Sequence, residues 1–334
     1  MKAIVYHHYG SPDVLQLAEV DIPEPRPDEI RVRMRASSVN PADGYLMRGH
    51  PYILRFQSGL KRPKNNGLGL DFAGVVDAVG DAVTVFRPGD EVFGEVSSLF
   101  TGRTRAFAEY LCVPAAIAVR KPQNLSFGEA ATVPLAGCTA LYAVRDYGQV
   151  KSGQHVLING AGGGIGIHAV QLAKYFGAKV TAVCSEGKMS LMSDIGADRV
   201  IDYKREDFTA QRTHYDVIVD IVSSQRARRC GRVLAPQGRF VWVGGPNTNR
   251  WIGPLSSALN VLLMSLVDRK HRWLCVSKTS TAEDLAMLAG LLAGLLAERA
   301  LRPVIDRRYP IEDVADAIRY LEKGHACGKI VIEI

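Results

Sequence analysis

The feature that most constrains the fold is a glycine-rich loop between an apolar run and a helical pattern. Residues 156–177 read VLINGAGGGIGIHAVQLAKYFG, in which Gly160, Gly163 and Gly166 form a G-x-x-G-x-x-G series. The first glycine permits a sharp turn out of a strand, the second a close approach of backbone to ligand, and the third close packing of the helix. A loop of this kind is typical of a βαβ unit that binds a diphosphate at the helix N-terminus.

The surrounding sequence predicts an α/β chain of two domains. After the loop, short helical patterns separate the strand-like runs KVTAVC, RVID, YDVIVDIV and RFVWVGG, which favours a parallel sheet. Before residue 125 the chain is rich in short strands such as IRVRMRASSV, which indicates a small barrel-like domain. The tail has a strand near VIDRRY, a helix over IEDVADAIRYLEKG and the strand KIVIEI. We therefore predict that residues 279–334 complete the domain formed by 1–124, and that 125–278 form the second domain.

Composition limits the partners and the compartment. The net charge of +7 suits a phosphate-bearing cofactor and gives only weak support to nucleic acid, which we do not expect as a partner. The six cysteines include no CxxC pair, which argues against a disulfide framework or a cysteine-rich zinc site. The N-terminal MKAIVYHHYG lacks the apolar core of a signal peptide. These features predict a cytoplasmic protein.

Two apolar stretches, 254–267 and 285–297, are shorter than the ~20 residues that span a bilayer. We expect both to form helices packed on the protein itself, with no transmembrane segment. A lipid-facing entrance for an apolar substrate is the alternative for these stretches.

The residues after the second strand predict a preference for NADPH. An NAD-selective site has a carboxylate at the end of that strand, but Cys184 stands there. Ser185, Lys188 and Tyr203 follow and can surround a 2′-phosphate. Glu186 lies where a ribose-binding carboxylate is an alternative, and we expect it to be solvated in the loop past the strand.

Over nearly its whole length, the chain resembles the medium-chain dehydrogenases/reductases, specifically their zinc-independent, quinone oxidoreductase-like branch. The motifs that carry the resemblance are NPADGYLMRG (40–49), GLDFAGVVDAVG (69–80), RPGDEVFG (87–94), AATVPLAGCTALYA (130–143), the glycine loop, IGADRVIDY (195–203), VWVGG (241–245) and GKIVIEI (328–334). The resemblance implies a GroES-like catalytic domain over 1–124 and 279–334, interrupted by a Rossmann NADPH-binding domain over 125–278. It also implies a cleft between them as active site, and a homodimer.

Zinc-dependent relatives have a cysteine before the NPAD motif, a His-Glu pair within GLDFAG, and a lobe with four cysteines. Here Leu70 and Asp71 stand at the pair, and Cys112 alone lies near the lobe. Asp71 or His50 can ligate a metal, but a zinc site needs three or four converging ligands, so we predict no zinc.

Hydride addition to a simple ketone gives an alkoxide that calls for a Lewis acid. Hydride addition to a quinone or enone gives a delocalised anion that hydrogen-bond donors can hold.

The resemblance also implies site residues. Asn40 lies beside the nicotinamide, Tyr45 is a cofactor contact or proton donor, and Tyr52 stands near a tyrosine of enoyl-reducing relatives. We therefore predict Asn40, Tyr45 and Tyr52 as catalytic, with packing as the alternative for each tyrosine. The predicted cofactor-binding residues are Asn40, Tyr45, Thr139 in the AGCTA turn, Gly160, Gly163, Gly164, Ile165, Gly166, Ser185, Lys188, Tyr203, Val222, Gly244 and Gly245. His168 and Cys138 are expected to be packed residues.

The sequence thus favours an NADPH-dependent reductase of quinones or α,β-unsaturated carbonyls. The alternatives are an enoyl-thioester reductase, an alcohol dehydrogenase-like enzyme, and a non-enzymatic NADPH-binding sensor with RNA or a membrane as partner. The physiological acceptor and the proton donor stay open.

Overall fold

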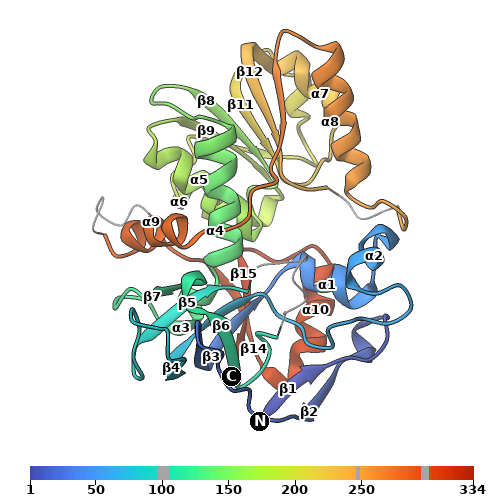
Figure 1. The fold of residues 1–334 in the computed structure, drawn as a ribbon. Helices are drawn as coiled ribbons and strands as arrows, with labels where there is room; N and C mark the ends of the chain where they lie inside the picture. Colours follow the sequence, from blue (N-terminus) through green and yellow to red (C-terminus); the bar gives the residue numbers. More distant parts are fainter. Residues whose placement is uncertain (97–104, 246–248, 295–300) are drawn as a thin grey trace. The chain divides into compact units, whose positions relative to one another are not determined.

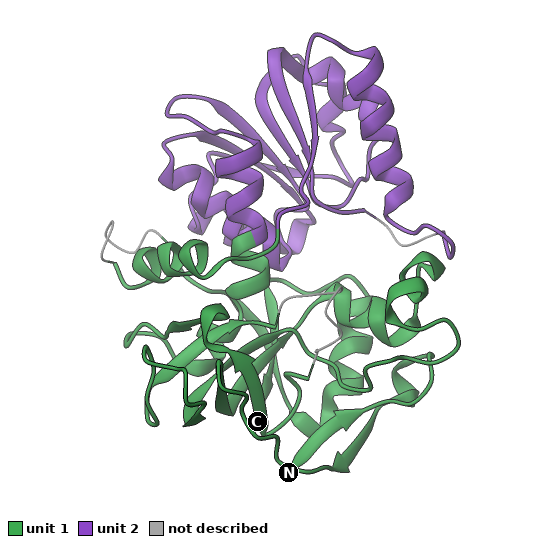
Figure 2. Cartoon of the chain, in the orientation of Figure 1, with its two compact units in different colours: residues 1–138, 279–334 green, residues 139–278 purple. Residues whose placement is uncertain are grey.

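The computed structural model describes residues 1–96, 105–245, 249–294 and 301–334 (Figure 1). It divides into two compact units (Figure 2). Unit 1 is Met1–Cys138 with Thr279–Ile334, and unit 2 is Thr139–Lys278. Helix α3 (Phe127–Ala131) contacts strands of unit 1, so this unit extends past residue 124, the limit suggested by the strand-rich sequence.

Unit 1 contains a two-stranded sheet, β1–β2, and a seven-stranded sheet of order β14-β15-β3-β4-β5-β7 in which β6 also pairs with β3, counting the described residues only. Its strands are β1 (Lys2–Val5), β2 (Gln16–Glu19), β3 (Glu29–Val39), β4 (Asp71–Val79), β5 (Glu91–Glu95), β6 (Tyr110–Pro114), β7 (Ala118–Arg120), β14 (Ile305–Pro310) and β15 (Lys329–Glu333). The helices besides α3 are α1 (Pro41–Arg48), α2 (Arg55–Ser58), α9 (Ala282–Leu292) and α10 (Val314–Glu322), and α4 (Pro134–Leu141) begins in unit 1 and ends in unit 2.

Strand β3 shows why this sheet forms. Ile30, Val32 and Met34 are buried in the core, while Arg33 between them is exposed, as a period of two requires. The tail strand β15 pairs antiparallel with β3, so the last residues of the chain complete the first sheet. This pairing brings Lys329 into a cluster of residues from the N-terminal part of unit 1.

Unit 2 is a parallel sheet of order β10-β9-β8-β11-β12-β13, which is the doubly wound arrangement of a Rossmann fold. The predicted α/β fold class, a GroES-like domain plus a Rossmann-type sheet, is confirmed. The strands are β8 (His155–Asn159), β9 (Lys179–Cys184), β10 (Arg199–Asp202), β11 (Tyr215–Asp220), β12 (Leu234–Trp242) and β13 (Arg272–Cys275). The α-helices are α5 (Gly164–Tyr175), α6 (Met189–Asp194), α7 (Ala227–Cys230) and α8 (Leu255–Val267).

One local expectation is wrong, and another holds for only one side of a helix. The AGCTA segment is part of helix α4 and not a turn, because a proline at the helix start and small apolar residues favour a buried helix. Helix α8 packs on the protein through Val261, but Leu262 and Leu266 on its outer side are exposed. Of the second apolar stretch, α9 covers the part up to Leu292, and 295–297 lie outside the described residues.

No helix in the described part of the chain has the length and hydropathy required to cross a membrane.

Candidate functional site

The glycine loop turns sharply between β8 and α5. Gly160 has a φ of +89°, and a β-carbon there would lie 2.7 Å from Val222 Cγ1. At Gly166 a β-carbon would lie 2.3 Å from the carbonyl oxygen of Gly160, so α5 packs directly on the loop backbone. At Gly163 the nearest atom would be 3.7 Å away, which is ordinary contact. The protein itself therefore requires glycine at the first and third positions, and the second is the one with space for a ligand.

Helix α5 begins at Gly164, with Gly163 as its N-cap. A glycine N-cap has no side chain that can accept from the first helical turn, in which Gly164 and Ile165 stand. The N-terminus of a helix has a partial positive charge and favours an anion. The glycine loop and the first turn of α5 thus lie where the sequence predicted a diphosphate site, and their contact with a diphosphate stays a prediction.

Ser185, Lys188 and Tyr203 follow neighbouring strands. Cys184 at the end of β9 pairs in register with Asp202 at the end of β10, so the three residues come from adjacent strand ends. The Lys188 side chain lies against the glycine loop, with Nζ 3.5 Å from the Gly162 carbonyl oxygen. Tyr203 is 55% exposed. A hydroxyl, an ammonium and a phenol thus follow the ends of β9 and β10, and the ammonium lies at the glycine loop.

Arg205, which the sequence analysis did not identify, compensates the negative charge of Glu186 at this edge of the sheet. Arg205 Nη2 donates to Glu186 Oε1 at 2.7 Å, and Arg205 Nε lies 3.7 Å from Asp202 Oδ2. Glu186 lies in a short 3₁₀-helix after β9, exposed, and its charge is compensated by the guanidinium. A basic residue just after the third strand was the signal that could have identified this pair.

The ends of β8, β11 and β12 are joined by a second group of hydrogen bonds. Asn159 Nδ2 donates to Asp220 Oδ1 at 2.8 Å, and the Ser223 N–H donates to the same oxygen at 2.9 Å. Ser223 has a φ of +49° and donates through Oγ to the Gly244 carbonyl at 2.8 Å. Burial raises the pKa of Asp220 to about 6, although both hydrogen bonds favour the ionised form. The sequence analysis did not include these polar residues.

Val222, Gly244 and Gly245 lie next to this group. Val222 is exposed and its side chain lies over Gly160. A β-carbon at Gly245 would lie 3.0 Å from Ser257 Oγ, so a larger residue would displace a neighbour. Thr139 is half-buried in α4, away from any turn. The coenzyme contacts of these four residues stay a prediction.

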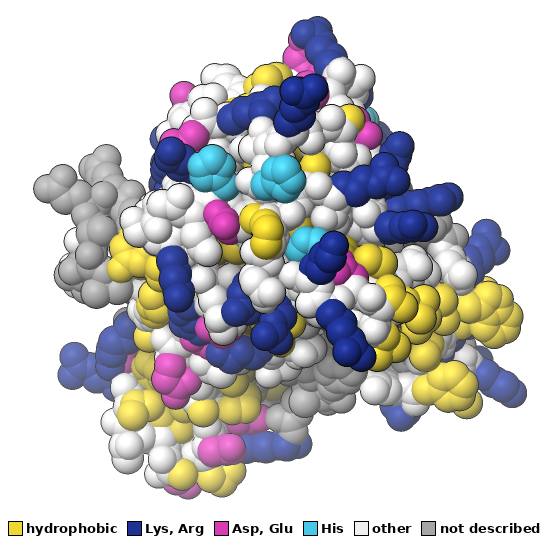
Figure 3. Space-filling model, turned by 90° about the horizontal axis from the view of Figure 1, so that it is seen from above, with side chains coloured by type: hydrophobic (Ala, Val, Ile, Leu, Met, Phe, Trp, Pro, Cys, Tyr) yellow, Lys and Arg dark blue, Asp and Glu magenta, His cyan; other side chains and the backbone are white. Residues whose placement is uncertain are grey.

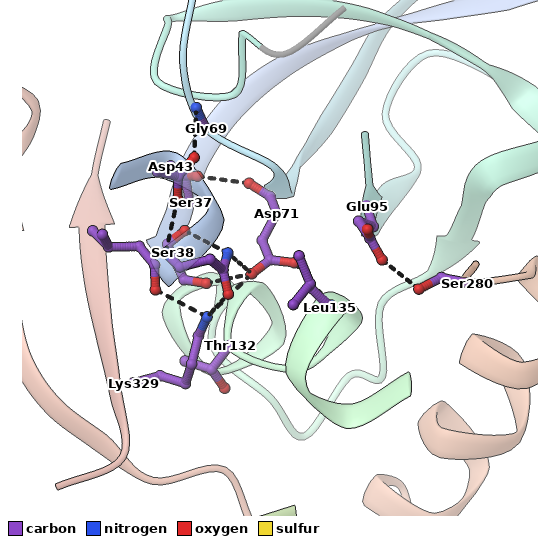
Figure 4. Close-up of polar contacts among 12 residues, drawn as sticks. Ser37, Ser38, Asp43, Gly69, Asp71, Glu95, Thr132, Leu135, Ser280 and Lys329 are labelled. Carbon is purple, nitrogen blue, oxygen red and sulfur yellow. Dashed lines mark hydrogen bonds and ion pairs between the residues drawn. The ribbon is translucent and has the colours of Figure 1, made fainter. Parts of the chain in front are cut away.

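In unit 1, Asp71 is the centre of a buried polar cluster (Figure 4). Its side chain is 0% exposed. Oδ1 accepts from the Leu135 N–H at 2.9 Å, and Oδ2 accepts from Ser38 Oγ at 2.6 Å and from Asn40 Nδ2 at 2.9 Å. Lys329 Nζ lies 3.3 Å from the same Oδ2. Both carboxylate oxygens are therefore used by protein donors.

Asn40 belongs to this cluster. Its Oδ1 accepts from Lys329 Nζ at 2.5 Å, and its Nδ2 also donates to the Ser38 carbonyl at 3.3 Å. Its backbone N–H donates to Asp43 Oδ2 at 2.8 Å, which fixes the start of α1. Burial raises the pKa of Asp43 to about 7. The Asn40 side-chain amide therefore forms hydrogen bonds within the protein. The predicted contact of Asn40 with nicotinamide stays a prediction.

This donor set does not fit a zinc ion. Within the described residues, no group of three or more His, Cys, Asp and Glu side chains is arranged to hold a metal. An ammonium and two neutral donors already contact Asp71 Oδ2. His50 stacks edge-on with Tyr52, with ring centroids 4.7 Å apart.

The two predicted catalytic tyrosines have different surroundings. Tyr45 is half-buried in α1, and burial raises the pKa of its phenol. Tyr52 lies between the His50 ring and the Arg55 guanidinium, whose Cζ is 4.7 Å from the Tyr52 centroid. The ring of Tyr52 makes packing contacts, and the catalytic role of each tyrosine stays a prediction.

Glu95 at the end of β5 was not identified from the sequence. It is paired in register with Asp71, accepts a short hydrogen bond from Ser280, and has a pKa raised to about 7 by burial and the Asp71 charge (Figure 4). Burial also raises the pKa of the Cys138 thiol, in keeping with a packed cysteine.

Comparison with known proteins identifies the family. Residues 26–123 match the family model described as alcohol dehydrogenase GroES-like domain, and 195–332 match the model described as zinc-binding dehydrogenase. The chain is 34% identical to the 2-methylene-furan-3-one reductase of Solanum lycopersicum, over 99% of this chain and 79% of that protein. It is 31% identical to the chloroplastic NADPH-dependent alkenal/one oxidoreductase of Arabidopsis thaliana, with the same coverage. The solved quinone oxidoreductase of Coxiella burnetii superposes with a TM-score of 0.86 at 30% identity, over 100% of this chain and 99% of that one.

These likenesses define a two-domain oxidoreductase with a Rossmann coenzyme domain. The chain belongs to the medium-chain dehydrogenase/reductase superfamily, in its quinone oxidoreductase-like branch, as the motifs predicted.

Proposed function

We propose that the protein reduces quinones or α,β-unsaturated carbonyls with NADPH, by direct hydride transfer and without catalytic zinc. The observation that carries this proposal is that both carboxylate oxygens of Asp71 already accept hydrogen bonds from the protein. The carboxylate stands where zinc-dependent relatives have a His-Glu pair, and both of its oxygens accept from protein donors. An ammonium, Lys329, lies at this carboxylate. A metal ligand would have to give up these bonds and lose a compensating charge.

The coenzyme assignment rests on the glycine loop and the first turn of α5 in unit 2. Gly163, Gly164 and Ile165 would hold the diphosphate at the N-terminus of α5. Lys188, with Ser185 and Tyr203, would hold the 2′-phosphate. When bound, NADPH supplies the hydride, and the protein orients it. Because Arg205 compensates the Glu186 charge, that carboxylate is less repulsive to the phosphate.

The acceptor class follows from the donors that the chain offers. Reduction of a conjugated acceptor places negative charge on a carbonyl oxygen, which a phenol can stabilise by donating a hydrogen bond. Tyr45 of the NPADGYLMRG motif, half-buried in α1, is our candidate for this donor, and burial raises the pKa of its phenol further. The enoyl-thioester alternative would take its donor from Tyr52 or Tyr45, and the Tyr52 ring contacts the His50 ring and the Arg55 guanidinium. The likeness to an alkenal/one oxidoreductase and to quinone oxidoreductases supports quinones and enones over thioesters.

We also propose a cytoplasmic homodimer. None of the six cysteines, all within the described residues, forms a disulfide, which suits a reducing compartment. Strand β13 is at the edge of the described sheet of unit 2, and an edge strand can pair with a second copy. Sedimentation of the purified protein measures the oligomeric state directly.

The test is NADPH oxidation with a panel of p-benzoquinone, alkenals, crotonyl-CoA and simple ketones, before and after exhaustive chelation. We expect turnover of a quinone or alkenal that chelation does not change. Stoichiometric zinc whose removal abolishes activity, or turnover of simple ketones alone, would overturn the proposal. Tight NADPH binding without turnover of any acceptor would favour the sensor alternative.

A further inference from the structure

The segment between α1 and β4 carries exposed apolar side chains on short helical turns (Figure 1). Ile53 is 44% exposed, Phe56 74% and Leu60 63%. Ile53 stands in a 3₁₀ turn, Tyr52–Leu54, that continues into α2, so Phe56, three residues on, lies on the same side of these turns. Single exposed apolar residues are normal, whereas three in so short a segment indicate a binding surface. We call Ile53, Phe56 and Leu60 the apolar tip.

Arg55 fixes the conformation of this segment. Its guanidinium lies between two aromatic rings, with Cζ 4.4 Å from the centroid of Tyr9 and 4.7 Å from that of Tyr52. Arg55 Nε donates to the Gly49 carbonyl at 2.9 Å. A β-carbon at Gly49 would lie 2.6 Å from Tyr9 Cδ1 and 2.8 Å from Arg55 Nε, so the packing around the guanidinium is tight. An arginine that is both stacked and hydrogen-bonded to backbone fixes the path of the chain.

Tyr9 attaches the same segment to the core of unit 1. Its ring packs against the apolar core formed by α1, α10 and β15. Its Oη donates to the Gly59 carbonyl at 2.7 Å and lies 3.0 Å from Ser58 Oγ. The backbone on both sides of Phe56 is therefore held by contacts with the rest of unit 1, and the fold keeps the Phe56 ring at the surface. An apolar surface that is already ordered binds a ligand at a lower entropic cost.

The tip is continuous with the helix that carries the candidate hydrogen-bond donor. The His50 N–H donates to the Tyr45 carbonyl at 3.1 Å, where α1 ends and this segment begins. Gly49, with a φ of +58°, turns the chain out of α1. Tyr45 and the tip therefore belong to one ordered stretch of unit 1, in which the donor comes first and the apolar side chains follow.

A second copy of the chain is better accommodated on unit 2. There α8, with its exposed leucines, packs on β13, the edge strand that suits pairing with a second copy. Figure 3 shows hydrophobic side chains gathered at the right of the face seen from above, the side on which Figure 1 draws α8. The tip belongs to unit 1, and it needs an occupant of another kind.

We propose that the apolar tip binds the hydrocarbon chain of the acceptor, so that the protein prefers enals, enones or quinones with an alkyl chain over their short homologues. This inference rests on the proposed function and defines its substrate class more closely. A chain that lies on Phe56 and Leu60 removes apolar surface from water on both partners. Each fully buried methylene group contributes about four-fold to affinity.

A lipid surface is the competing occupant, because the exposed cations Lys61, Arg62 and Lys64 follow the tip. An interfacial helix, however, buries an extended apolar face in the headgroup region. The tip has only two short helical turns, and these are fixed to the end of α1. These features favour a single alkyl chain as the occupant.

The test measures NADPH oxidation with straight-chain 2-alkenals of increasing length, from propenal to 2-nonenal. We expect kcat/KM to rise by about two-fold to four-fold for each added methylene group, because a chain on this surface is partly or fully buried. In Phe56→Ser/Leu60→Ser, the ratio of kcat/KM for 2-nonenal to that for propenal should fall at least ten-fold. Calorimetry with nonanal, a saturated aldehyde, and the NADP⁺-loaded protein measures the same contact without turnover.

The matched control is Ile22→Ser/Val85→Ser, which removes two exposed apolar side chains from other segments of unit 1 and should retain the wild-type ratio. Circular dichroism shows whether each variant is folded. A wild-type kcat/KM that does not rise with chain length overturns the proposal, and so does a ratio that falls equally in the control. Binding to phosphatidylglycerol vesicles that Phe56→Ser/Leu60→Ser abolishes, with the chain-length ratio retained, would assign the tip to a lipid surface instead.

The calorimetry separates this proposal from the proposed function. If no acceptor is turned over but nonanal binds, and Phe56→Ser/Leu60→Ser weakens that binding, the proposed function fails and the role of the tip stands. Turnover of propenal without any gain from a longer chain has the opposite meaning. Neither turnover nor nonanal binding would overturn both.

Discussion

Lys329 and Asp71 form a buried ion pair, 3.3 Å between Nζ and Oδ2, that joins the last strand of the chain to β4. The two residues are 258 positions apart in the sequence. Both side chains are nearly inaccessible to solvent, and the ammonium also donates to Asn40 Oδ1 and to the Val39 carbonyl. The pair therefore couples the tail to the loop before α1.

Lys329→Met should destabilise the protein by about 3–5 kcal/mol, because it leaves the Asp71 carboxylate buried without its countercharge. Urea unfolding measures the change. Lys2→Met is the control, since the exposed Lys2–Glu312 pair at 3.5 Å should contribute less than about 1 kcal/mol. Equal losses in the two variants would contradict the role that we assign to the buried pair.

The glycine loop could be predicted from the sequence because its requirements are local. The turn at Gly160 and the close packing at Gly166 follow from the spacing of glycines between a strand and a helix. The Asp71–Lys329 pair could not be predicted, because nothing in GKIVIEI shows that its lysine enters the core. That position is fixed by the pairing of β15 with β3, a contact between the two ends of the chain.

Helix α8 shows a second limit of sequence patterns. Its composition indicates a buried helix, and the inner side is indeed packed through Val261. A nearly continuous apolar run has no polar face, so it does not reveal which side a neighbour covers. For this reason the sequence did not predict that Leu262 and Leu266 are exposed. Their exposure indicates an interaction with a partner outside the monomer.

Asp220→Asn should change the pH dependence of stability. The folded pKa of about 6 lies above the ordinary value for aspartate, so between about pH 4 and pH 6 the folded state retains a proton that the unfolded state loses. This group therefore lowers stability as pH rises through that window, by up to about 3 kcal/mol. The variant should lose this part of the slope while Oδ1 still accepts from Asn159 and Ser223.

Unfolding by urea at pH 4, 5, 6 and 7 checks this prediction. Asp81→Asn, at an exposed carboxylate, is the comparison and should retain the wild-type profile. A profile for Asp220→Asn that parallels the wild type throughout would show that the Asp220 carboxyl does not hold its proton in the fold.

Lys188→Ala should weaken NADPH binding by about ten-fold to a hundred-fold and leave NADH binding nearly unchanged, because one charged contact to the 2′-phosphate is lost. Titration calorimetry with both coenzymes gives the ratio. Lys174→Ala, which removes a lysine paired with Asp198 on the same unit, should not alter it. An equal loss for the two coenzymes would place the ammonium at the diphosphate instead.

Arg205→Ala should shift the preference toward NADH, since it releases the Glu186 carboxylate to repel a 2′-phosphate and accept from ribose hydroxyls. The Kd for NADPH should rise at least five-fold and that for NADH should stay the same or fall. Adding Glu186→Gln in the same variant should restore most of the NADPH affinity. Failure of the double variant to recover would mean that Arg205 contacts the coenzyme itself.

Gly163→Ala and Gly166→Ala should have different effects. The first should weaken NADPH binding with little change in stability, and the second should lower the free energy of unfolding. At Gly166 a new β-carbon would be 2.3 Å and 2.5 Å from two carbonyl oxygens of the loop, so we expect a loss of about 3 kcal/mol in unfolding free energy. At Gly163 it would meet no atom closer than 3.7 Å, and the extended backbone there suits alanine, so stability should change by less than about 1 kcal/mol. NADPH affinity should nevertheless fall at least ten-fold, because the methyl group would occupy the space left for the diphosphate. Gly187→Ala, with nothing within 4 Å of the added atom, is the control for stability. A Gly163→Ala variant that binds NADPH like the wild type would show that the coenzyme does not approach the second glycine.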